Sequence, residues 1–511
     1  MNTRVDETAM AADCCARPRK PALAKFYNRA RILPAVIGLL ALALRLYRVG
    51  AESVGYDEAF SLSFAAEPLP SMMQDLVRDF VHPPLHYLVL TAWMKVFGFG
   101  VMQARLLSVV CGTLAVIVLY ALAGRLFGRM TAAVAALLLA ISELGVIFSQ
   151  EARPYAQFLL LFLCSSYLFV RAIQAGSRRC WWLFVVTAIL MIYTHYYGFL
   201  VLAALGLWML LFRRSNTLPL KWIAGGLVAG IVCYAPWVAS GIVREMGASS
   251  RTASGVQPYW ATHWFTFFSA TTVFGNGKPA DLMRTSPWWA YAASTVLFFV
   301  PALLALKELK AKDRTLWEGI ALFAILYALP LVAATVLGLL FHVQYHVRYV
   351  AFCAAPYYVL VARGIAGLRP RIAAAFIVLL VTYSAASGLR ASYVVPRKEN
   401  FRDAVKYVRQ EYHDGDCTVF VPFGTRQWNI SGGTPLAVRT ITLDTLESRN
   451  GGLPPGVAYR LGYEWQPLGR RARRNCTAAV DAYIFESRRK TILLGKRWLV
   501  RKEIGRDSNP F

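Results

Sequence analysis

Residues 32–60 read ILPAVIGLLALALRLYRVGAESVGYDEAF, an apolar segment followed a few residues later by the acidic pair Asp57-Glu58. The apolar part, 32–48, falls within the length range of a membrane-spanning helix. A carboxylate beside a bilayer must be solvated, paired or put to chemical use, because charge is costly in lipid. The pair is therefore either a solvated loop beside a helix or part of a site at the membrane surface.

The composition is that of a membrane protein with many spans. Of the 511 residues, 57% are hydrophobic, and the formal net charge is +27. The basic residues lie mainly in short clusters between apolar segments, which is the positive-inside pattern and also suits anionic membrane lipids, so we expect no nucleic-acid partner. The polar and basic N-terminus, residues 1–31, predicts a retained cytoplasmic anchor rather than a cleaved signal peptide.

Hydropathy and charge together predict a polytopic α-helical protein. The apolar segments are 32–48, 84–98, 106–124, 131–148, 156–173, 181–194, 197–212, 222–240, 288–306, 318–340, 349–363 and 372–388. Basic clusters after several of them mark cytoplasmic turns. Asp57 and Glu151 then lie on the same outer face only if 84–98 does not cross, so we assign this short segment to a juxtamembrane or re-entrant helix. About 11 spans result (range 11–13), with the N-terminus inside and the C-terminus outside.

The chain changes character after the transmembrane portion, 32–388. Long apolar runs stop, residues 397–410 predict an amphipathic helix, and residues 416–423 predict a strand. We expect 389–511 to form a small extracytoplasmic α/β domain. Cys417 and Cys476 would share an oxidising compartment there, and a disulfide between them is a hypothesis.

Polar groups of the membrane portion gather at the outer face. Six of the seven histidines fall at outer loops or helix ends, beside Asp57, Glu58, Glu151, Arg153 and Arg348. Each group alone has a structural interpretation; Arg105, for example, could be a snorkelling side chain. Together they suit group transfer, because a carboxylate can serve as a general base while arginine and histidine donors hold a phosphate.

The order of short motifs resembles a known family. Tyr56-Asp57-Glu58-Ala59-Phe60 precedes His82-Pro83-Pro84-Leu85-His86-Tyr87, and Ser149-Gln150-Glu151-Ala152-Arg153-Pro154-Tyr155 follows. This order is similar to that of the GT-C membrane glycosyltransferases, in the bacterial branch related to protein O-mannosyltransferases and the lipid A aminoarabinose transferase. The resemblance covers roughly 32–390 and is strongest over 55–160.

The resemblance implies transfer of a sugar, with inversion, from a polyprenyl-phosphate donor to a lipid, glycan or protein acceptor. The reaction would take place at the periplasmic face of a bacterial inner membrane, with the first outer loop, 49–105, as the catalytic loop. It implies catalytic roles for Asp57, the presumed general base, and its neighbour Glu58. The residues expected to bind the donor phosphate are His82, Arg153 and Arg348, and those expected to bind substrate are Glu151, Tyr155, His195 and Tyr349.

A divalent metal ion is left open, since no cofactor follows from the sequence. Glu58, Glu151, His263 and His342 could contribute ligands, but their spacing matches no compact metal motif. Two other classes of function are alternatives: a transporter or flippase of lipid-linked glycans, and a non-catalytic scaffold. Transporters often carry paired internal repeats with ionisable groups near the bilayer midplane, whereas here the charges gather at one face.

Overall fold

A computed structural model describes residues 20–79, 82–212, 218–247, 288–310, 313–341, 347–394, Lys398 and seven short strands between 417 and 501. The first of these ranges contains a helix where the apolar segment 32–48 predicted one. This helix, α1 (Lys20–Leu46), begins twelve residues before the apolar segment. The predicted outer loop 49–105 contains three helices, α2 (Tyr56–Ala66), α3 (Leu69–Asp79) and α4 (Leu85–Phe97).

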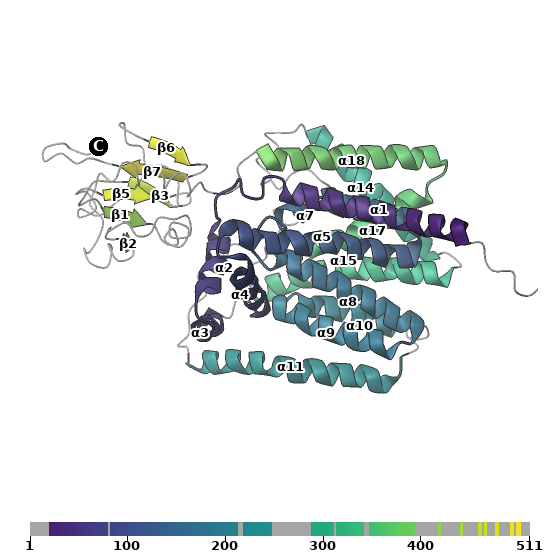
Figure 1. Ribbon diagram of the computed structural model, residues 1–511, viewed down its shortest axis with the longest axis horizontal. Coiled ribbons are helices and arrows are strands. Elements are labelled where there is room, and N and C mark those ends of the chain that lie inside the picture. The colour runs from purple at the N-terminus through teal and green to yellow at the C-terminus, as the bar shows by residue number, and fades with distance from the viewer. Residues whose placement is uncertain are drawn as a thin grey trace, which may run out of the picture.

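The remaining helices form a bundle. Helices α2, α3 and α4 lie together at one end of this bundle (Figure 1). Their bounds are α5 (Val101–Phe127), α6 (Arg129–Ile141), α7 (Glu143–Ile147), α8 (Tyr155–Ala175), α9 (Arg178–Thr194), α10 (Gly198–Leu211), α11 (Leu220–Gly247), α14 (Trp288–Lys307), α15 (Arg314–Phe341), α16 (Val347–Val350), α17 (Ala354–Gly367) and α18 (Arg371–Val394). Two 3-10 turns, η2 (Glu308–Lys310) and η3 (Ala351–Cys353), connect them.

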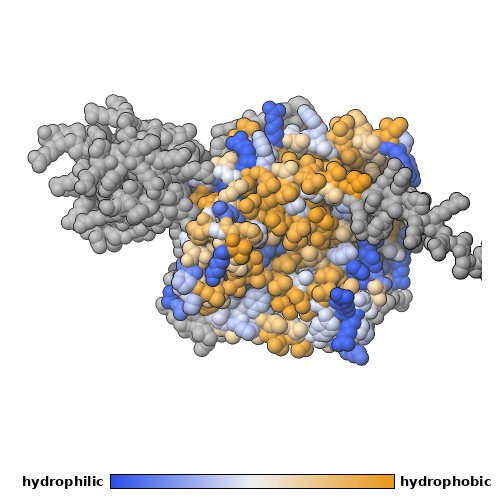
Figure 2. Space-filling model, viewed as in Figure 1, coloured by the Kyte–Doolittle hydropathy of each residue, from blue (hydrophilic) through white to orange (hydrophobic). Residues whose placement is uncertain are grey.

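Six of the described helices are long and apolar enough to cross a membrane, and five shorter apolar helices accompany them. Apolar side chains cover the middle of the face shown in Figure 2, and most strongly hydrophilic ones lie toward its two ends. Exposed apolar residues of the described helices include Leu39, Val186 and Leu227. The molecule is thus a multi-pass membrane protein, while the figure of about 11 spans stays a prediction.

The predicted segment 131–148 is two helices rather than one. Helix α6 stops at Ile141, and Ser142 starts α7 as its N-cap, with its hydroxyl accepting a hydrogen bond from the Gly145 N–H at 3.2 Å. A helix that ends inside a membrane protein leaves carbonyl groups that cannot reach water. The break therefore requires a donor at this depth.

Arg45 of α1 supplies that donor. Its side chain is fully buried and donates to the carbonyls of Leu139 and Ala140 at 3.2 and 3.1 Å, at the end of α6, and to the hydroxyl of Ser149 at 3.0 Å. A cation at a helix C-terminus is also favoured by the helix dipole. Gly112 of α5 makes room, since a Cβ there would collide with the Ser149 hydroxyl and lie 3.0 Å from Arg45 Nε.

The acidic pair and the Glu151 motif lie at the same end of the bundle. The Ala152 N–H donates to Glu58 Oε1 at 3.0 Å, and Arg153 Nη1 donates to the Asp57 carbonyl at 3.0 Å. This confirms the expectation that placed both motifs on one face. Helix α4 has 13 residues, about 20 Å of helix, which is short for a full crossing.

The C-terminal strands form two sheets. One has five strands in the order β2-β1-β5-β7-β6, with β1 parallel to β2 and β5, and the other is a β3-β4 hairpin. Their bounds are β1 (Cys417–Phe420), β2 (Thr440–Thr442), β3 (Ala458–Leu461), β4 (Glu464–Pro467), β5 (Cys476–Ala479), β6 (Thr491–Leu494) and β7 (Arg497–Arg501). β1 falls within the predicted strand 416–423, whereas the predicted helix 397–410 lies outside the described residues apart from Lys398.

Cys417 and Cys476 occupy the same register position on the neighbouring parallel strands β1 and β5. Adjacent strands lie about 4.8 Å apart, a Cα separation within the range that a disulfide spans. The register is compatible with the hypothesised disulfide, which stays a prediction.

We expect Arg45→Met to destabilise the fold, because it leaves the last carbonyls of α6 without a donor. The free energy of unfolding should fall by on the order of 2 kcal/mol, which for a chain of this length corresponds to a loss of roughly 2 °C in melting temperature. Arg48→Met, at an exposed arginine three residues on, is the matched control and should melt like the wild type. Equal melting temperatures for the two variants in detergent would contradict the role given to Arg45.

Candidate functional site

The site is built on the first turn of α2. Gly55 is the N-cap, and its N–H donates to Glu58 Oε2 at 3.1 Å, which is the backbone half of a capping box. Asp57 and Glu58 both lie in this first turn, where the helix dipole favours negative charge. The dipeptide therefore starts a helix instead of lying in an irregular loop.

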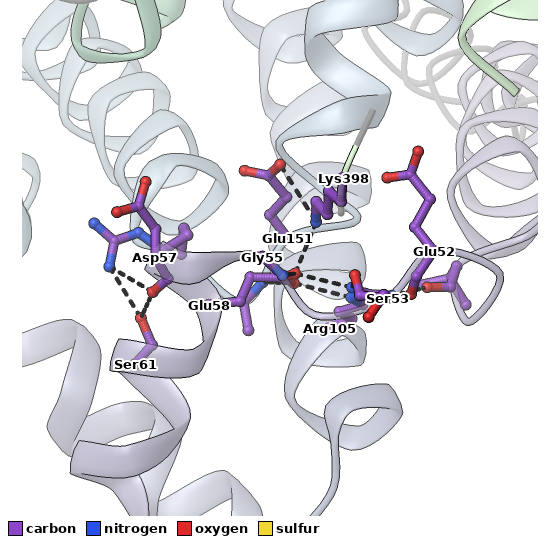
Figure 3. A network of polar contacts seen from close by, with 12 residues as sticks. Glu52, Ser53, Gly55, Asp57, Glu58, Ser61, Arg105, Glu151 and Lys398 are labelled. Atoms are coloured by element: carbon purple, nitrogen blue, oxygen red, sulfur yellow. Dashed lines mark hydrogen bonds and ion pairs between the residues drawn. The ribbon is translucent and has the colours of Figure 1, made fainter. Parts of the chain in front are cut away.

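Glu58 is buried and fully engaged. Its carboxylate accepts from Arg105 Nε and Nη2 at 2.9 Å each, in a bidentate pair, and its side chain is 2% exposed. The N–H groups of Gly55 and Ala152 and the ammonium of Lys398, at 2.7 Å, complete its partners (Figure 3). Both oxygens are occupied, so neither is directed at a substrate or a metal ion.

Burial by itself raises the pKa of Glu58, but Lys398 and Arg105 outweigh it and hold that pKa well below its ordinary value. Glu58 is therefore an ionised anchor at every ordinary pH. Arg105 is correspondingly not a snorkelling side chain: it is 1% exposed and also donates to the carbonyls of Val49, Glu52 and Ser53 at 2.8 to 3.0 Å.

Asp57 differs sharply from its neighbour. Its side chain is 36% exposed, and its carboxylate pairs with Arg348 of α16. Its backbone carbonyl accepts from Arg153 and from the Ser61 hydroxyl at 3.2 Å. These two hydrogen bonds fix the backbone of Asp57, while its carboxylate stays accessible to a substrate.

Arg153 and His82 form a second buried pair. Arg153 is 2% exposed and donates through Nη2 to His82 Nε2 at 3.1 Å. A guanidinium can only donate, so His82 Nε2 accepts and the ring proton lies on Nδ1. Burial first, and then the charge of Arg153, lowers the pKa of His82 well below its ordinary value. Within the described residues, the His82 Nδ1–H has no partner.

His195 lies in the turn between α9 and α10, packed among aromatic rings. Its ring centroid is 5.7 Å from that of Tyr349, 6.1 Å from that of Tyr155 and 6.4 Å from that of His82. Its Nδ1 accepts from the Tyr197 N–H at 3.2 Å. Burial, with Arg153 and Arg348 adding to it, lowers the pKa of His195 to about 3, so this ring is neutral as well.

A narrow, mostly apolar pocket adjoins these groups. It lies between the α6–α7 break, the start of α8 and η3, and both Tyr155 and Arg348 line it. Arg348 therefore faces the pocket and pairs with Asp57, while its guanidinium carbon lies 5.4 Å from the ring centroid of Tyr349. The pocket has mostly apolar walls and adjoins the charged site at Tyr155 and Arg348.

The structure brings together every described residue that the sequence nominated: Asp57, Glu58, His82, Glu151, Arg153, Tyr155, His195, Arg348 and Tyr349. Of the possible metal ligands, His263 and His342 lie outside the described residues, and within them no group of three such side chains is close enough to hold a metal ion. Lys398 and Arg105 were missed as site residues. A signal for Arg105 existed, because a buried carboxylate needs a cationic partner; nothing pointed to Lys398.

We expect Glu58→Gln to lower the free energy of unfolding by about 3 kcal/mol, because it leaves buried cations without their carboxylate. Since the pKa of Glu58 is lowered in the fold, the stability it contributes is fully present above the ordinary carboxyl pKa and is lost as pH falls. The gap in melting temperature between wild type and variant should therefore be constant from about pH 8 to 5 and narrow below about pH 4. A gap that widened on acidification would contradict the ionised anchor. Asp75→Asn, in an exposed pair with Arg78, is the control.

The chain is similar to known proteins in part of its sequence and in its fold. A family model described as dolichyl-phosphate-mannose-protein mannosyltransferase matches residues 81–239, less than half of the chain. No curated protein matches the sequence.

Among solved structures, the archaeal oligosaccharyltransferase AglB from Archaeoglobus fulgidus, in complex with an inhibitory peptide and a dolichol-phosphate, is similar at a TM-score of 0.52 and 11% identity. The match covers 80% of this chain and 64% of that one, so the chain spans less than two thirds of that protein's length. ArnT from Cupriavidus metallidurans, bound to undecaprenyl phosphate, matches at a TM-score of 0.41 and 14% identity, over 91% of this chain and 97% of that chain. The family model supports the resemblance to protein O-mannosyltransferases drawn from the motifs over residues 81–239, and the likeness to the archaeal oligosaccharyltransferase is a likeness in fold.

Proposed function

We propose that the protein transfers a sugar from a polyprenyl-phosphate donor to an envelope acceptor, with Asp57 as general base. The observation that carries this proposal is Arg153. Its guanidinium is buried, yet its hydrogen bonds in the described part of the chain go to neutral acceptors: a carbonyl, the Ser61 hydroxyl and His82. A buried cation that donates no hydrogen bond to a carboxylate is poised for an anionic ligand.

A phosphodiester suits the donors around Arg153. The guanidinium supplies a permanent charge and the His82 Nδ1–H supplies one neutral hydrogen bond, while Arg348 lies where the apolar pocket meets the site. The apolar walls suit the first carbons of a lipid chain. The likeness in fold to a solved oligosaccharyltransferase that holds a dolichol-phosphate supports the same class of donor.

The chemistry follows from the difference between Asp57 and Glu58. The more exposed Asp57 carboxylate takes the proton of an acceptor hydroxyl or amine as that atom attacks the anomeric carbon. The bond from this carbon to the phosphate oxygen breaks, and the phosphate leaves with the electron pair, stabilised by Arg153 and Arg348. Attack opposite the leaving phosphate inverts the anomeric carbon.

The remaining nominated residues line the sugar's position in this proposal. Tyr155, His195 and Tyr349 form an aromatic cluster next to the donors, and Glu151 lies across Lys398 from Glu58. These neutral rings are better suited to bind an uncharged hexose than to bind a second anion. We place the site at the periplasmic face of the inner membrane, with residues 389–511 on the same side and a lipid, glycan or protein as acceptor.

Asp57→Asn should abolish transfer without unfolding the protein. Loss of a general base lowers kcat by about 100- to 10,000-fold, while the partly exposed position tolerates an amide. The assay uses purified protein in lipid nanodiscs, radiolabelled undecaprenyl-phosphate hexoses with mannose first, and envelope fractions of a deletion strain as acceptor. Wild-type rates in Asp57→Asn, at an unchanged melting temperature, would refute the base assignment.

Arg153→Met should weaken donor use most. We expect the KM for the lipid-linked sugar to rise by about 10-fold or more, because a charge-assisted bond to a buried anion is lost. Arg125→Met, at a surface arginine that donates to Gln174, is the control. An unaltered donor KM in Arg153→Met would show that the phosphate binds elsewhere.

A further inference from the structure

Lys398 reaches the site from the other end of the chain. It lies four residues beyond the end of α18, where the C-terminal region begins, and its side chain is 12% exposed. Its ammonium lies 2.7 Å from Glu58 Oε2 and 3.4 Å from Glu151 Oε1, and Figure 3 shows it pointing between these two carboxylates. Glu58 and Lys398 are 340 residues apart in sequence.

Lys398 is one of two cations paired with Glu58. Arg105 alone forms a bidentate pair with Glu58, and two backbone N–H groups add to it. Two further hydrogen bonds, from the Ala152 N–H to Glu58 and from Arg153 to the Asp57 carbonyl, already hold the first turn of α2 to the segment before α8. Lys398 adds the start of the C-terminal region to this junction, because its ammonium lies between Glu58 and Glu151. Its alkyl stem also lies over Gly55, where a Cβ would come 3.5 Å from Lys398 Cδ.

The contacts therefore fall on the N-terminal turn that carries Asp57. Gly55 and Glu58 flank Asp57 in this turn; Lys398 pairs with Glu58, and its stem lies next to Gly55. On the opposite side, Arg153 holds the Asp57 carbonyl. A displacement of the turn would move the carboxylate relative to the acceptor while the buried donor-phosphate groups stayed in place.

We propose that Lys398 is a positioning residue, which clamps the first turn of α2 to the Glu151 segment and so makes the placement of Asp57 depend on the start of the C-terminal region. This inference rests on the proposed function. It gives the junction between the membrane portion and the C-terminal region a direct part in sugar transfer. Lys398 itself touches no reacting atom.

The test compares Lys398→Met, which removes the charge but keeps the stem, with Lys398→Arg, which keeps a cation. Lys95→Met, at an exposed lysine near the end of α4, is the matched control. Kinetic constants are measured per folded full-length protein in nanodiscs with the undecaprenyl-phosphate hexose that the wild type uses. Hydrogen exchange of a peptide over residues 53–66 is followed by mass spectrometry on the same samples.

In Lys398→Met we expect kcat to fall by about 10- to 100-fold, the loss typical of a misplaced catalytic group, with the donor KM within about twofold of the wild type. Exchange over 53–66 should be at least about tenfold faster. Lys398→Arg should restore most of kcat, and Lys95→Met should match the wild type.

Unchanged exchange over 53–66 in Lys398→Met would overturn the clamp whatever the activity, and so would an unchanged kcat. A fall confined to the yield of folded protein, with normal kcat per folded molecule, would also overturn it. If the wild type transferred no sugar from any donor, the proposed function would be wrong and this inference would fall with it. If the wild type transferred sugar and Lys398→Met did so equally well, the present inference alone would be wrong.

Discussion

The buried pair of Glu58 and Arg105 is the constraint around which the site is arranged. Taking two charges out of water is costly, and a pair of this kind is favourable only when the remaining donors and acceptors are also satisfied. Here they are: Arg105 reaches three carbonyls of residues 49–53, and Glu58 takes two backbone N–H groups. The pair thereby ties together α5, the start of α2, the loop before it and Ala152.

A second polar cluster plays a comparable part deeper in the bundle. Arg45 donates hydrogen bonds to the carbonyls at the end of α6. Ser142, which starts α7, forms a hydrogen bond with the Tyr358 hydroxyl of α17 at 2.9 Å. The break between α6 and α7 lets the chain turn toward the pocket, where Leu139 and Gly145 become lining residues. The shape of the pocket thus depends on one arginine from α1, which satisfies a helix end that water cannot reach.

The sequence predicted the long apolar helices well and the side-chain contacts poorly, for physical reasons. Long apolar runs leave few alternatives in lipid, so the predicted segments 156–173 and 372–388 lie inside α8 and α18. Helices α2 and α3 were missed because they are short and their stability comes from packing and capping. The nominated site residues followed from motif order. Lys398 could not be predicted as a site residue, because a single lysine in a polar stretch shows no periodicity and its partner Glu58 lies 340 residues away.

Three arginines of similar burial take different roles because their partners differ. Arg105 has a carboxylate and three carbonyls, Arg45 has carbonyls and a hydroxyl at a helix end, and Arg153 has a carbonyl, a hydroxyl and a histidine nitrogen. A bidentate carboxylate completes the first, and a helix dipole complements the second. The third has neither and lies beside the accessible carboxylate of Asp57, next to the His82 N–H, which has no partner among the described residues. Burial therefore does not tell a structural arginine from a ligand-binding one, whereas the hydrogen-bond partners do. None of those described for Arg153 is a carboxylate, so an anion could complete the site there.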